Sequence, residues 1–316
     1  MKIFAEKTDG NEVEITNINE FCLTQSLGVP CDSLWIKFFD ENDIGEISKI
    51  KLYDKENLIF NGLCDCQKSS ESKSGYEISI FARSTACILV DNETVPYTYE
   101  KPSAKQLCRC IAEKFGFFCA LPEIYSDMAY EVTAGSSCYG AVSRFVSLLT
   151  GSYIYVTPNN EIKAAELSGN VKSINIYDVL TAVHTIDRSE PISKIRFKKS
   201  SGEPRYNMNT EARLGSELGI KRETYINLSA LPQWQRDNTV LKRLKASYEN
   251  YDTLEITVSG YADESLMQCF SYETKRRRYE NYYLAEKKYM CSEKGEFTKL
   301  TLRKNIDIQE ITYVDK

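Results

Sequence analysis

The chain has 316 residues, 42% of them hydrophobic and 27% charged, which is the composition of a globular protein rather than a disordered, fibrous or membrane-embedded one. Forty basic and 45 acidic residues give a net charge of −5, which argues against a double-stranded DNA binder with a basic face. At roughly 100 to 150 residues per domain, the length predicts two or three domains.

Residues 1–85 follow a strand pattern with a period of two. Leu34, Ile36 and Phe38 alternate with the side chains between them, so one face of this strand is buried and the other is exposed or packed on a neighbour. Short stretches rich in Asp, Asn, Ser and Gly separate this run from similar ones, as turns do. The pattern predicts a first antiparallel β-barrel domain over residues 1–85.

Residues 86–182 change character and predict a small α+β domain. Ser103 and Gln106 have the spacing of a capping box, so a helix is expected to begin at Ser103. A second helix is expected to begin at Ser136 or Ser137, where an apolar stripe at helical spacing starts. A two-stranded hairpin is expected directly after it.

The strand pattern returns in residues 183–264, which predict a second barrel domain with a helix at about 230–249 between its strands. Residues 265–316 predict a β-rich C-terminal segment made of hairpins. The fold class is therefore α+β and mainly β, with two barrels flanking the α+β domain. The longest apolar runs are only a few residues, so no membrane contact is expected.

The eleven cysteines do not have the spacing of a metal site. No C-x-x-C occurs, and the pairs Cys64/Cys66 and Cys108/Cys110 lack a matching second pair or a histidine at zinc spacing. The chain also lacks a Walker A sequence and a G-x-G-x-x-G, so neither a metal nor a cofactor is expected. No signal peptide is recognisable, and in a reducing cytoplasm cysteines serve mostly as small buried apolar residues.

One catalytic alternative remains open at this stage. Cys138 is expected at a helix N-terminus, where the helix dipole lowers the pKa of a thiol. His184 is the single histidine in the chain and thus the one histidine that could serve as its base. Together they would make a cytoplasmic cysteine hydrolase, an alternative to a protein without catalytic residues.

The segment Phe81–Asp91 resembles a sequence motif of baseplate hub proteins from contractile phage tails and phage tail-like injection particles, the Mu-like hub and late control protein D-like family. The residues that match this motif are Arg83, Leu89, Val90 and Asp91, whereas Ala82 and Ile88 depart from it. The family continues with a capped helix, and Leu107, Ile111, Phe115 and Gly116 have its spacing. The order of the predicted domains is similar to the family along nearly the whole chain.

This resemblance implies a structural protein, not an enzyme, whose two barrels are similar to tail-tube subunits. It implies a homotrimeric ring that adapts the hexameric tail tube to the trimeric spike, with the tail tube protein, the spike protein and other baseplate proteins as partners. The expected location is the baseplate of a virion, or of a phage-like or bacteriocin-like tail particle assembled in the bacterial cytoplasm. DNA is expected at most as passing cargo, and a hub with peptidoglycan hydrolase activity is a further alternative.

The resemblance also gives expectations for single residues. Arg83 and Asp91 are expected to form an ion pair or a hydrogen-bonded bracket where the first barrel meets the α+β domain. Trp35 and Phe39 lie on the alternate face of a predicted strand and are expected at an interface with neighbouring subunits.

Overall fold

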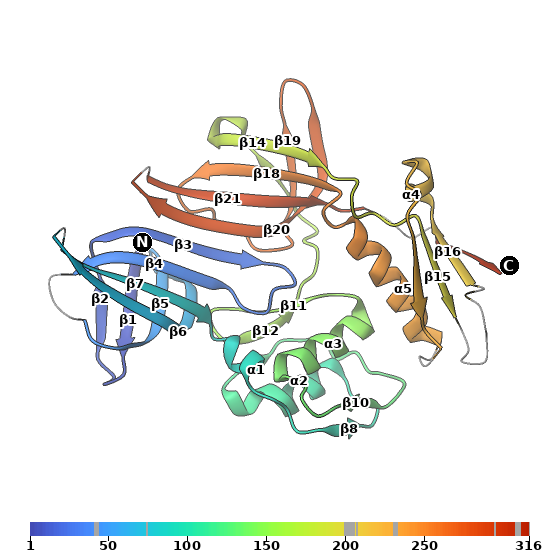
Figure 1. The fold of residues 1–316 in the computed structure, drawn as a ribbon, viewed down its shortest axis with the longest axis horizontal. Helices are drawn as coiled ribbons and strands as arrows, with labels where there is room; N and C mark the ends of the chain where they lie inside the picture. Colours follow the sequence, from blue (N-terminus) through green and yellow to red (C-terminus); the bar gives the residue numbers. More distant parts are fainter. Residues whose placement is uncertain are drawn as a thin grey trace.

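The computed structural model describes residues 1–40, 44–73, 75–198, 206, 208–229, 233–293, 295–306 and 311–315. Figure 1 shows four units: a first β unit in blue at the left, an α+β unit in green below, a second β unit mostly in orange and red above, and a smaller unit around one long helix at the right. Within the described residues, no helix is long and apolar enough to cross a membrane.

The first β unit is an antiparallel sheet curled around one apolar core. Its strands are β1 (Lys2–Lys7), β2 (Glu12–Ile15), β3 (Ile18–Ser26), β4 (Ser33–Asp40), β5 (Ile47–Asp54), β6 (Asn57–Ser72) and β7 (Gly75–Ser84). They lie in the order β3-β4-β7-β6-β5-β1-β2. The alternating side chains Leu34, Ile36 and Phe38 are at most 1% exposed, as the period of two predicts.

The α+β unit has its own core, and two of its helices begin where expected. It comprises α1 (Cys87–Asp91), β8 (Tyr97–Tyr99), α2 (Ala104–Ala112), the 3₁₀ turn Glu113–Phe115, β9 (Phe118–Cys119), β10 (Tyr130–Val132), α3 (Cys138–Thr150), β11 (Ile154–Val156) and β12 (Glu161–Ala164). The Ser103–Gln106 capping box is confirmed, since each side chain accepts a hydrogen bond from the backbone of the other. Ser137 caps α3, and β11 pairs with β12 as a hairpin.

The second β unit is a similar curled sheet whose strands come from two separate stretches of the chain. Its elements are β13 (Val171–Ile174), the 3₁₀ turn Ile176–Asp178, β14 (Val179–Ile186), β18 (Asp252–Ser259), β19 (Cys269–Glu273), β20 (Arg278–Ser292) and β21 (Gly295–Lys304). Phe270, Leu284 and Leu302 lie in its core and are at most 1% exposed.

The elements between these two stretches, together with the last strand β22, build a fourth unit. It comprises β15 (Lys194–Lys198), β16 (Met208–Ala212), α4 (Arg213–Glu217), β17 (Glu223–Asn227), α5 (Gln233–Tyr248) and β22 (Ile311–Asp315). Helix α5 buries Val240, Leu244 and Tyr248 against the small sheet β17-β15-β16-β22. The expected helix at 230–249 is thus present over 233–248, while residues 230–232 lie outside the described residues.

The grouping of strands therefore differs from the expected barrel over 183–264 and segment over 265–316. Strand β15 pairs with β16 and β17, whereas β14 and β18 pair with each other and join β19, β20 and β21 from the C-terminal segment. The physical reason is that a period of two identifies the buried face of a strand but not its partner. The fold class is as expected: a mainly β α+β chain with two tail-tube-like antiparallel units and an α+β unit.

One sheet of 13 strands runs through both β units. It is continuous because β20 is shared: its first part pairs with β19, and its second part, Glu286–Cys291, pairs with β3 of the first unit. The pairing is antiparallel and places Met290 opposite Cys22. The two β units are thus held side by side by backbone hydrogen bonds.

Five strands of each β unit follow the same plan. The order β3-β4-β7-β6-β5 in the first unit corresponds to β14-β18-β21-β20-β19 in the second. The hairpin that pairs Ser72 with Gly75 corresponds to the one that pairs Ser292 with Gly295. Both long strands of these hairpins carry a bulge at the same place, after Cys64 in β6 and after Leu284 in β20.

Equivalent residues of the two β units lie at one constant interval in the sequence. The interval from Ser72 to Ser292 also relates the residues of β4 to those of β18, and the residues of β7 to those of β21. Identical residues related by this interval, in these strands or directly before them, are Asp32 and Asp252, Leu34 and Leu254, Ile36 and Ile256, and Arg83 and Arg303. The similarity of the two β units extends from architecture to sequence.

Gly62 in β6 offers a test of the first core. A Cβ at this position would lie 2.3 Å from the carbonyl oxygen of Arg83 and 2.5 Å from the ring of Phe60, so neither the strand nor the ring has room for it. We expect Gly62→Ala to lower the free energy of unfolding by about 1–3 kcal/mol, measured by urea denaturation. Gly169→Ala, where no atom lies within 4 Å of the new Cβ, is the matched control and should leave the midpoint nearly unchanged.

Candidate assembly interface

Arg83 joins three segments at the boundary between the first β unit and the α+β unit. From the end of β7, its Nε donates to Asp65 Oδ2 at 2.5 Å and its Nη2 to Asp65 Oδ1 at 3.1 Å. The same guanidinium donates through Nη1 and Nη2 to the two carboxylate oxygens of Asp91, at 3.1 and 2.7 Å. Asp65 lies in the bulge of β6, and Asp91 is the last residue of α1. We call these three residues the Arg83 bracket.

The charges of the Arg83 bracket reinforce each other. The hydrogen bonds from Arg83 hold the pKa of the Asp91 carboxyl below its ordinary value. Asp65 and then Asp91 raise the pKa of Arg83 still further above neutrality. A planar guanidinium can meet two carboxylates in this way because its five N–H donors form a rigid fork, which a lysine lacks.

Leu89 and Val90 anchor the helix that carries Asp91. Leu89 is 1% exposed in the core of the α+β unit, and Val90 is partly buried against the same core. The four residues that match the family motif thus lie together. Arg83 is on the strand, Leu89 and Val90 are in the neighbouring core, and Asp91 contacts Arg83. The sequence reasoning missed Asp65, and a single Asp between two cysteines carries no signal of its role.

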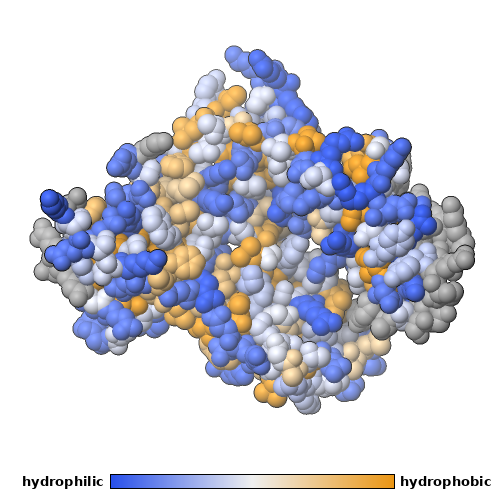
Figure 2. Space-filling model, in the orientation of Figure 1, coloured by the Kyte–Doolittle hydropathy of each residue, from blue (hydrophilic) through white to orange (hydrophobic). Residues whose placement is uncertain are grey.

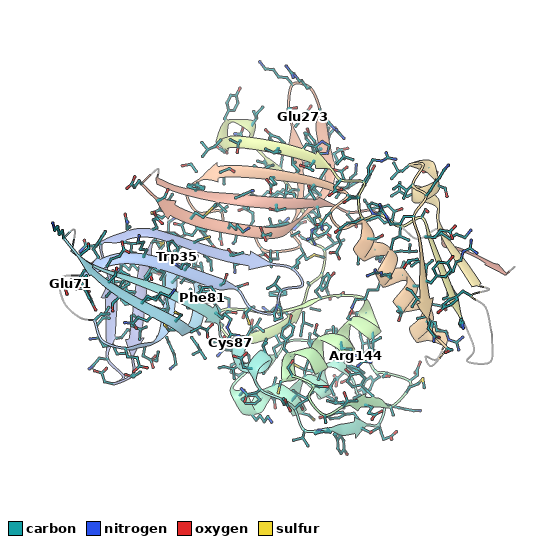
Figure 3. All side chains as sticks on the ribbon, viewed as in Figure 1. Trp35, Glu71, Phe81, Cys87, Arg144 and Glu273 are labelled. Carbon is teal, nitrogen blue, oxygen red and sulfur yellow. A yellow bond between two sulfur atoms is a disulfide. The ribbon has the colours of Figure 1, made fainter. Side chains whose placement is uncertain are left out.

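Trp35 and Phe39 lie on the outer face of the first β unit. Trp35 is 36% exposed and stands directly opposite Phe81 of β7, which is 38% exposed; Figure 3 shows the two side chains on the same part of the sheet. Phe39 is half-buried opposite Glu77, and the ion pair of Lys37 with Glu77 separates it from Trp35.

Trp35 is part of a row that crosses the shared sheet. Successive strand pairings place the following apolar or sulfur-containing side chains opposite one another: Phe297, Met290, Cys22, Trp35, Phe81 and Cys66. We call this set the outer row. Elsewhere on the face drawn in Figure 2, apolar residues lie in small groups among hydrophilic ones. A continuous apolar row on an exposed sheet is the kind of surface that subunits cover.

The structure does not bring Cys138 and His184 together. Cys138 begins α3 but is fully buried in the core of the α+β unit, and burial raises the pKa of its thiol. His184 lies on β14 in the second β unit, and Figure 1 shows α3 and β14 at opposite sides of the molecule. Its Nε2 is 2.9 Å from Asp252 Oδ1, which also accepts a hydrogen bond from the Tyr282 hydroxyl. The thiol is therefore buried away from the single histidine of the chain.

The cysteines differ in one respect from the sequence expectation. Cys108 and Cys119 form a disulfide between α2 and β9, with their Cα atoms 6.1 Å apart, so these two are not merely small apolar side chains. This pair was not predictable from the sequence, because the contact depends on how β9 returns along α2. The other nine cysteines are free, and among the described residues no group of His, Cys, Asp or Glu could hold a metal ion.

Two of the cavities that lie where units meet are lined in part by lysines. One, of about 530 Å³, lies between α3, α5 and β21, where Figure 2 shows the surface hollowed, and Lys242, Lys245 and Lys304 line part of it. The other, of about 330 Å³, is lined by Lys287, which is 5% exposed and donates to the carbonyl oxygens of Ala262 and Glu264. Burial lowers the pKa of Lys287. Neither cavity adds a nucleophile with a base.

No protein-family model matches the chain, and no curated protein matches it. Several solved structures do match the chain. The tail protein from Neisseria meningitidis MC58 is 14% identical, with a TM-score of 0.79 and coverage of 96% of both chains. The 43 kDa tail protein of prophage MuSo2 from Shewanella oneidensis is 14% identical, with a TM-score of 0.79 and coverage of 96% of this chain and 98% of the other.

A more distant match is an Escherichia coli component of the type VI secretion system, described as structurally similar to the bacteriophage T4 tail proteins gp27 and gp5. It is 8% identical, with a TM-score of 0.55 and coverage of 92% of this chain and 74% of the other. The chain therefore has the fold of phage tail and baseplate hub-like proteins, and the resemblance found in the sequence is confirmed at the level of fold.

The thiol count tests the disulfide. Under denaturing conditions without reductant, we expect nine of the eleven cysteines to react with a thiol reagent, because Cys108 and Cys119 are bonded to each other. After reduction all eleven should react, as counted by mass spectrometry of the alkylated protein. Eleven reactive thiols before reduction, in protein purified without reductant, would contradict the pairing.

The Arg83 bracket is tested by Arg83→Lys, because a lysine ammonium cannot serve two carboxylates through paired hydrogen bonds. At neutral pH we expect the free energy of unfolding to fall by about 1–3 kcal/mol. Arg109→Lys alters an exposed pair with Glu113 on α2 and is the control, with an expected change under about 0.5 kcal/mol.

The pH dependence of Arg83→Lys follows from the lowered pKa of Asp91. A carboxyl with a lowered folded-state pKa contributes stability above its unfolded pKa of about 3.9, and this contribution is lost as the pH falls through the folded pKa. The difference between wild type and Arg83→Lys should therefore shrink below about pH 4. A difference that stays constant down to pH 2 would show that the bracket does not act through charge.

Proposed function

We propose that this chain is a structural baseplate hub of a phage or phage-like contractile tail. Three copies form a ring that adapts the hexameric tail tube to the trimeric spike. The observation that carries this proposal is the repeat: two β units with the same strand order lie side by side in one continuous sheet. Three such chains offer six similar units to a sixfold tube while keeping threefold symmetry toward a spike.

The comparisons support the proposal through the fold. Two tail proteins share this fold over nearly their whole length. The type VI secretion component is described as similar to two tail proteins of bacteriophage T4, which supports a tail or baseplate role for this chain as well. The partners in this proposal are two further copies of the chain, the tail tube protein, the spike protein and other baseplate proteins, within a virion or tail-like particle.

The site residues then have structural roles. The Arg83 bracket fixes the angle between the first β unit and the α+β unit, with Leu89 and Val90 as its anchor in the core. The outer row, which includes Trp35, is covered by neighbouring subunits, and so is Phe39 beside it. The domains would be two tube-like units, the α+β unit and the unit around α5. The hydrolase alternative finds no support in the positions of Cys138 and His184.

The purified protein should have the mass of three chains by light scattering after size exclusion, and negative-stain images should show rings. Cys138→Ala should leave both results unchanged, because the thiol fills a core position and has no catalytic partner. A monomer with a hydrolase activity that disappears in Cys138→Ala would contradict the hub.

A further inference from the structure

The cavity between α3, α5 and β21 is lined by an excess of positive charge in a chain whose net charge is −5. Its charged lining residues are three lysines and one glutamate: Lys242, Lys245, Lys304 and Glu249. Lys242 and Lys245 are three residues apart on one face of α5, and Lys304 is the last residue of β21. Three ammonium groups from two elements therefore border one volume of about 530 Å³. We call it the lysine cavity.

The glutamate of the lysine cavity does not neutralise the lysines, because its carboxylate has other partners. Glu249 Oε1 accepts a hydrogen bond from the Tyr153 hydroxyl at 2.5 Å, and Glu249 Oε2 accepts one from Arg303 Nη1 at 3.1 Å. The Arg303–Glu249 pair has no net charge. The charges of the three lysines therefore remain.

The C-terminal end of α3 also borders the lysine cavity, and the carbonyl groups of such an end attract cations. Two of these carbonyl groups already accept hydrogen bonds from other residues. Gly151 donates its backbone N–H to the carbonyl oxygen of Ser147 at 3.0 Å, and Asn238 Nδ2 donates to that of Leu148 at 3.0 Å. Capping of α3 therefore does not require the lysines.

The three lysines differ in their contacts. Lys242 Nζ donates to Ser147 Oγ at 2.6 Å, and Lys304 Nζ lies 3.6 Å from Asp252 Oδ2. Lys245 is exposed, and it forms no hydrogen bond or ion pair with any residue in the part of the chain that the structure describes. Like charges on one helix face repel each other, so Lys242 and Lys245 together destabilise α5 unless an anion lies between them.

We propose that the lysine cavity binds a small ligand that carries at least two phosphate groups. Its volume of about 530 Å³ lies in the range of small-molecule sites. Lysine binds phosphate as a point charge, whereas paired recognition of carboxylates is typical of arginine. Linked phosphates match several ammonium groups better than a single anion does, because each phosphate can meet a cation of its own. The hydroxyl groups of Ser147 and Tyr283 and the amide of Asn305 line the same cavity as further donors.

A ligand in the lysine cavity would connect three units of the chain. Helix α5 belongs to the unit at the right of Figure 1, α3 to the α+β unit and β21 to the second β unit. Figure 2 shows the hollow between these parts of the surface. Bound phosphates would replace the repulsion between lysines by attraction and so hold α5 against the other two units. This inference goes beyond the hub proposal and does not depend on it.

The experiment is calorimetric titration of the full chain with sodium tripolyphosphate at low ionic strength and without divalent cations. We expect saturable binding at one site per chain, with an affinity that falls as salt is added. Lys245→Glu should weaken binding roughly tenfold or more, and Lys245→Arg should largely retain it, because it keeps the charge. Arg243→Glu makes the same charge change on α5 at a residue outside the cavity lining, and is expected to alter the affinity less than about twofold.

Thermal unfolding separates a ligand site from a purely structural role of the lysines. Without ligand, Lys245→Met should melt at the same temperature as wild type or higher, because it removes a repulsion. Tripolyphosphate should raise the melting temperature of wild type and of Arg243→Glu, but not that of Lys245→Glu. A lower melting temperature for ligand-free Lys245→Met, together with no effect of tripolyphosphate on wild type, would show that Lys245 is structural and would overturn the site.

Orthophosphate and citrate, titrated in the same way, test the class of ligand. Both should bind roughly tenfold more weakly than tripolyphosphate, or worse. Equal affinity for orthophosphate would contradict a ligand with several phosphates, and equal affinity for citrate would contradict the preference for phosphate. Absence of saturable tripolyphosphate binding at millimolar concentrations, or equal losses in Arg243→Glu and Lys245→Glu, would overturn the site. None of these results would affect the hub proposal, which the mass of the assembly tests separately.

Discussion

The pairing of β3 with β20 is the constraint on which the arrangement of the molecule depends. It brings together residues as far apart in the chain as Ser26 and Glu286, whose side chains hydrogen-bond at 2.8 Å. Strand β20 also contributes to both cores: Tyr289 is 1% exposed within the core of the first unit, with its ring 4.9 Å from that of Phe21, whereas Leu284 lies in the core of the second. The two β units therefore share a strand as well as a boundary, and their relative orientation is fixed.

The α+β unit is attached by a different kind of interaction. The Arg83 bracket sits where β7 ends and α1 begins, so a charged, directional contact defines the angle between a sheet and a helical core. Equivalent positions have taken different roles in the two units: Arg303, the counterpart of Arg83, hydrogen-bonds Glu249 at 3.1 Å, next to the C-terminal end of α5. One arginine position on the repeated sheet thus holds a different neighbouring unit in each case.

The features that sequence predicted are those decided within a few residues. The capping box at Ser103, the start of α3 at Ser137 and the hairpin after it depend on local hydrogen bonds and turn residues. Strand partners were not predictable in this way, because β14 and β15 follow one another closely in the chain yet belong to different sheets. Asp65 and the Cys108–Cys119 pair also depend on tertiary contacts. The repeat is visible in the sequence, since Asp-Ser-Leu at 32–34 and Asp-Thr-Leu at 252–254 lie at the start of equivalent strands.

The position of Tyr289 has a consequence for biosynthesis. A domain at the N-terminus of a chain generally folds while the rest is still being made. The first β unit cannot complete its core in that order, because the strand that covers β3 and the ring that packs on Phe21 emerge from the ribosome only after the intervening units have been made. Until then the nascent chain carries an open strand edge beside an incomplete core. Because the first unit shares β20, its surface is complete only after the second unit has been synthesised.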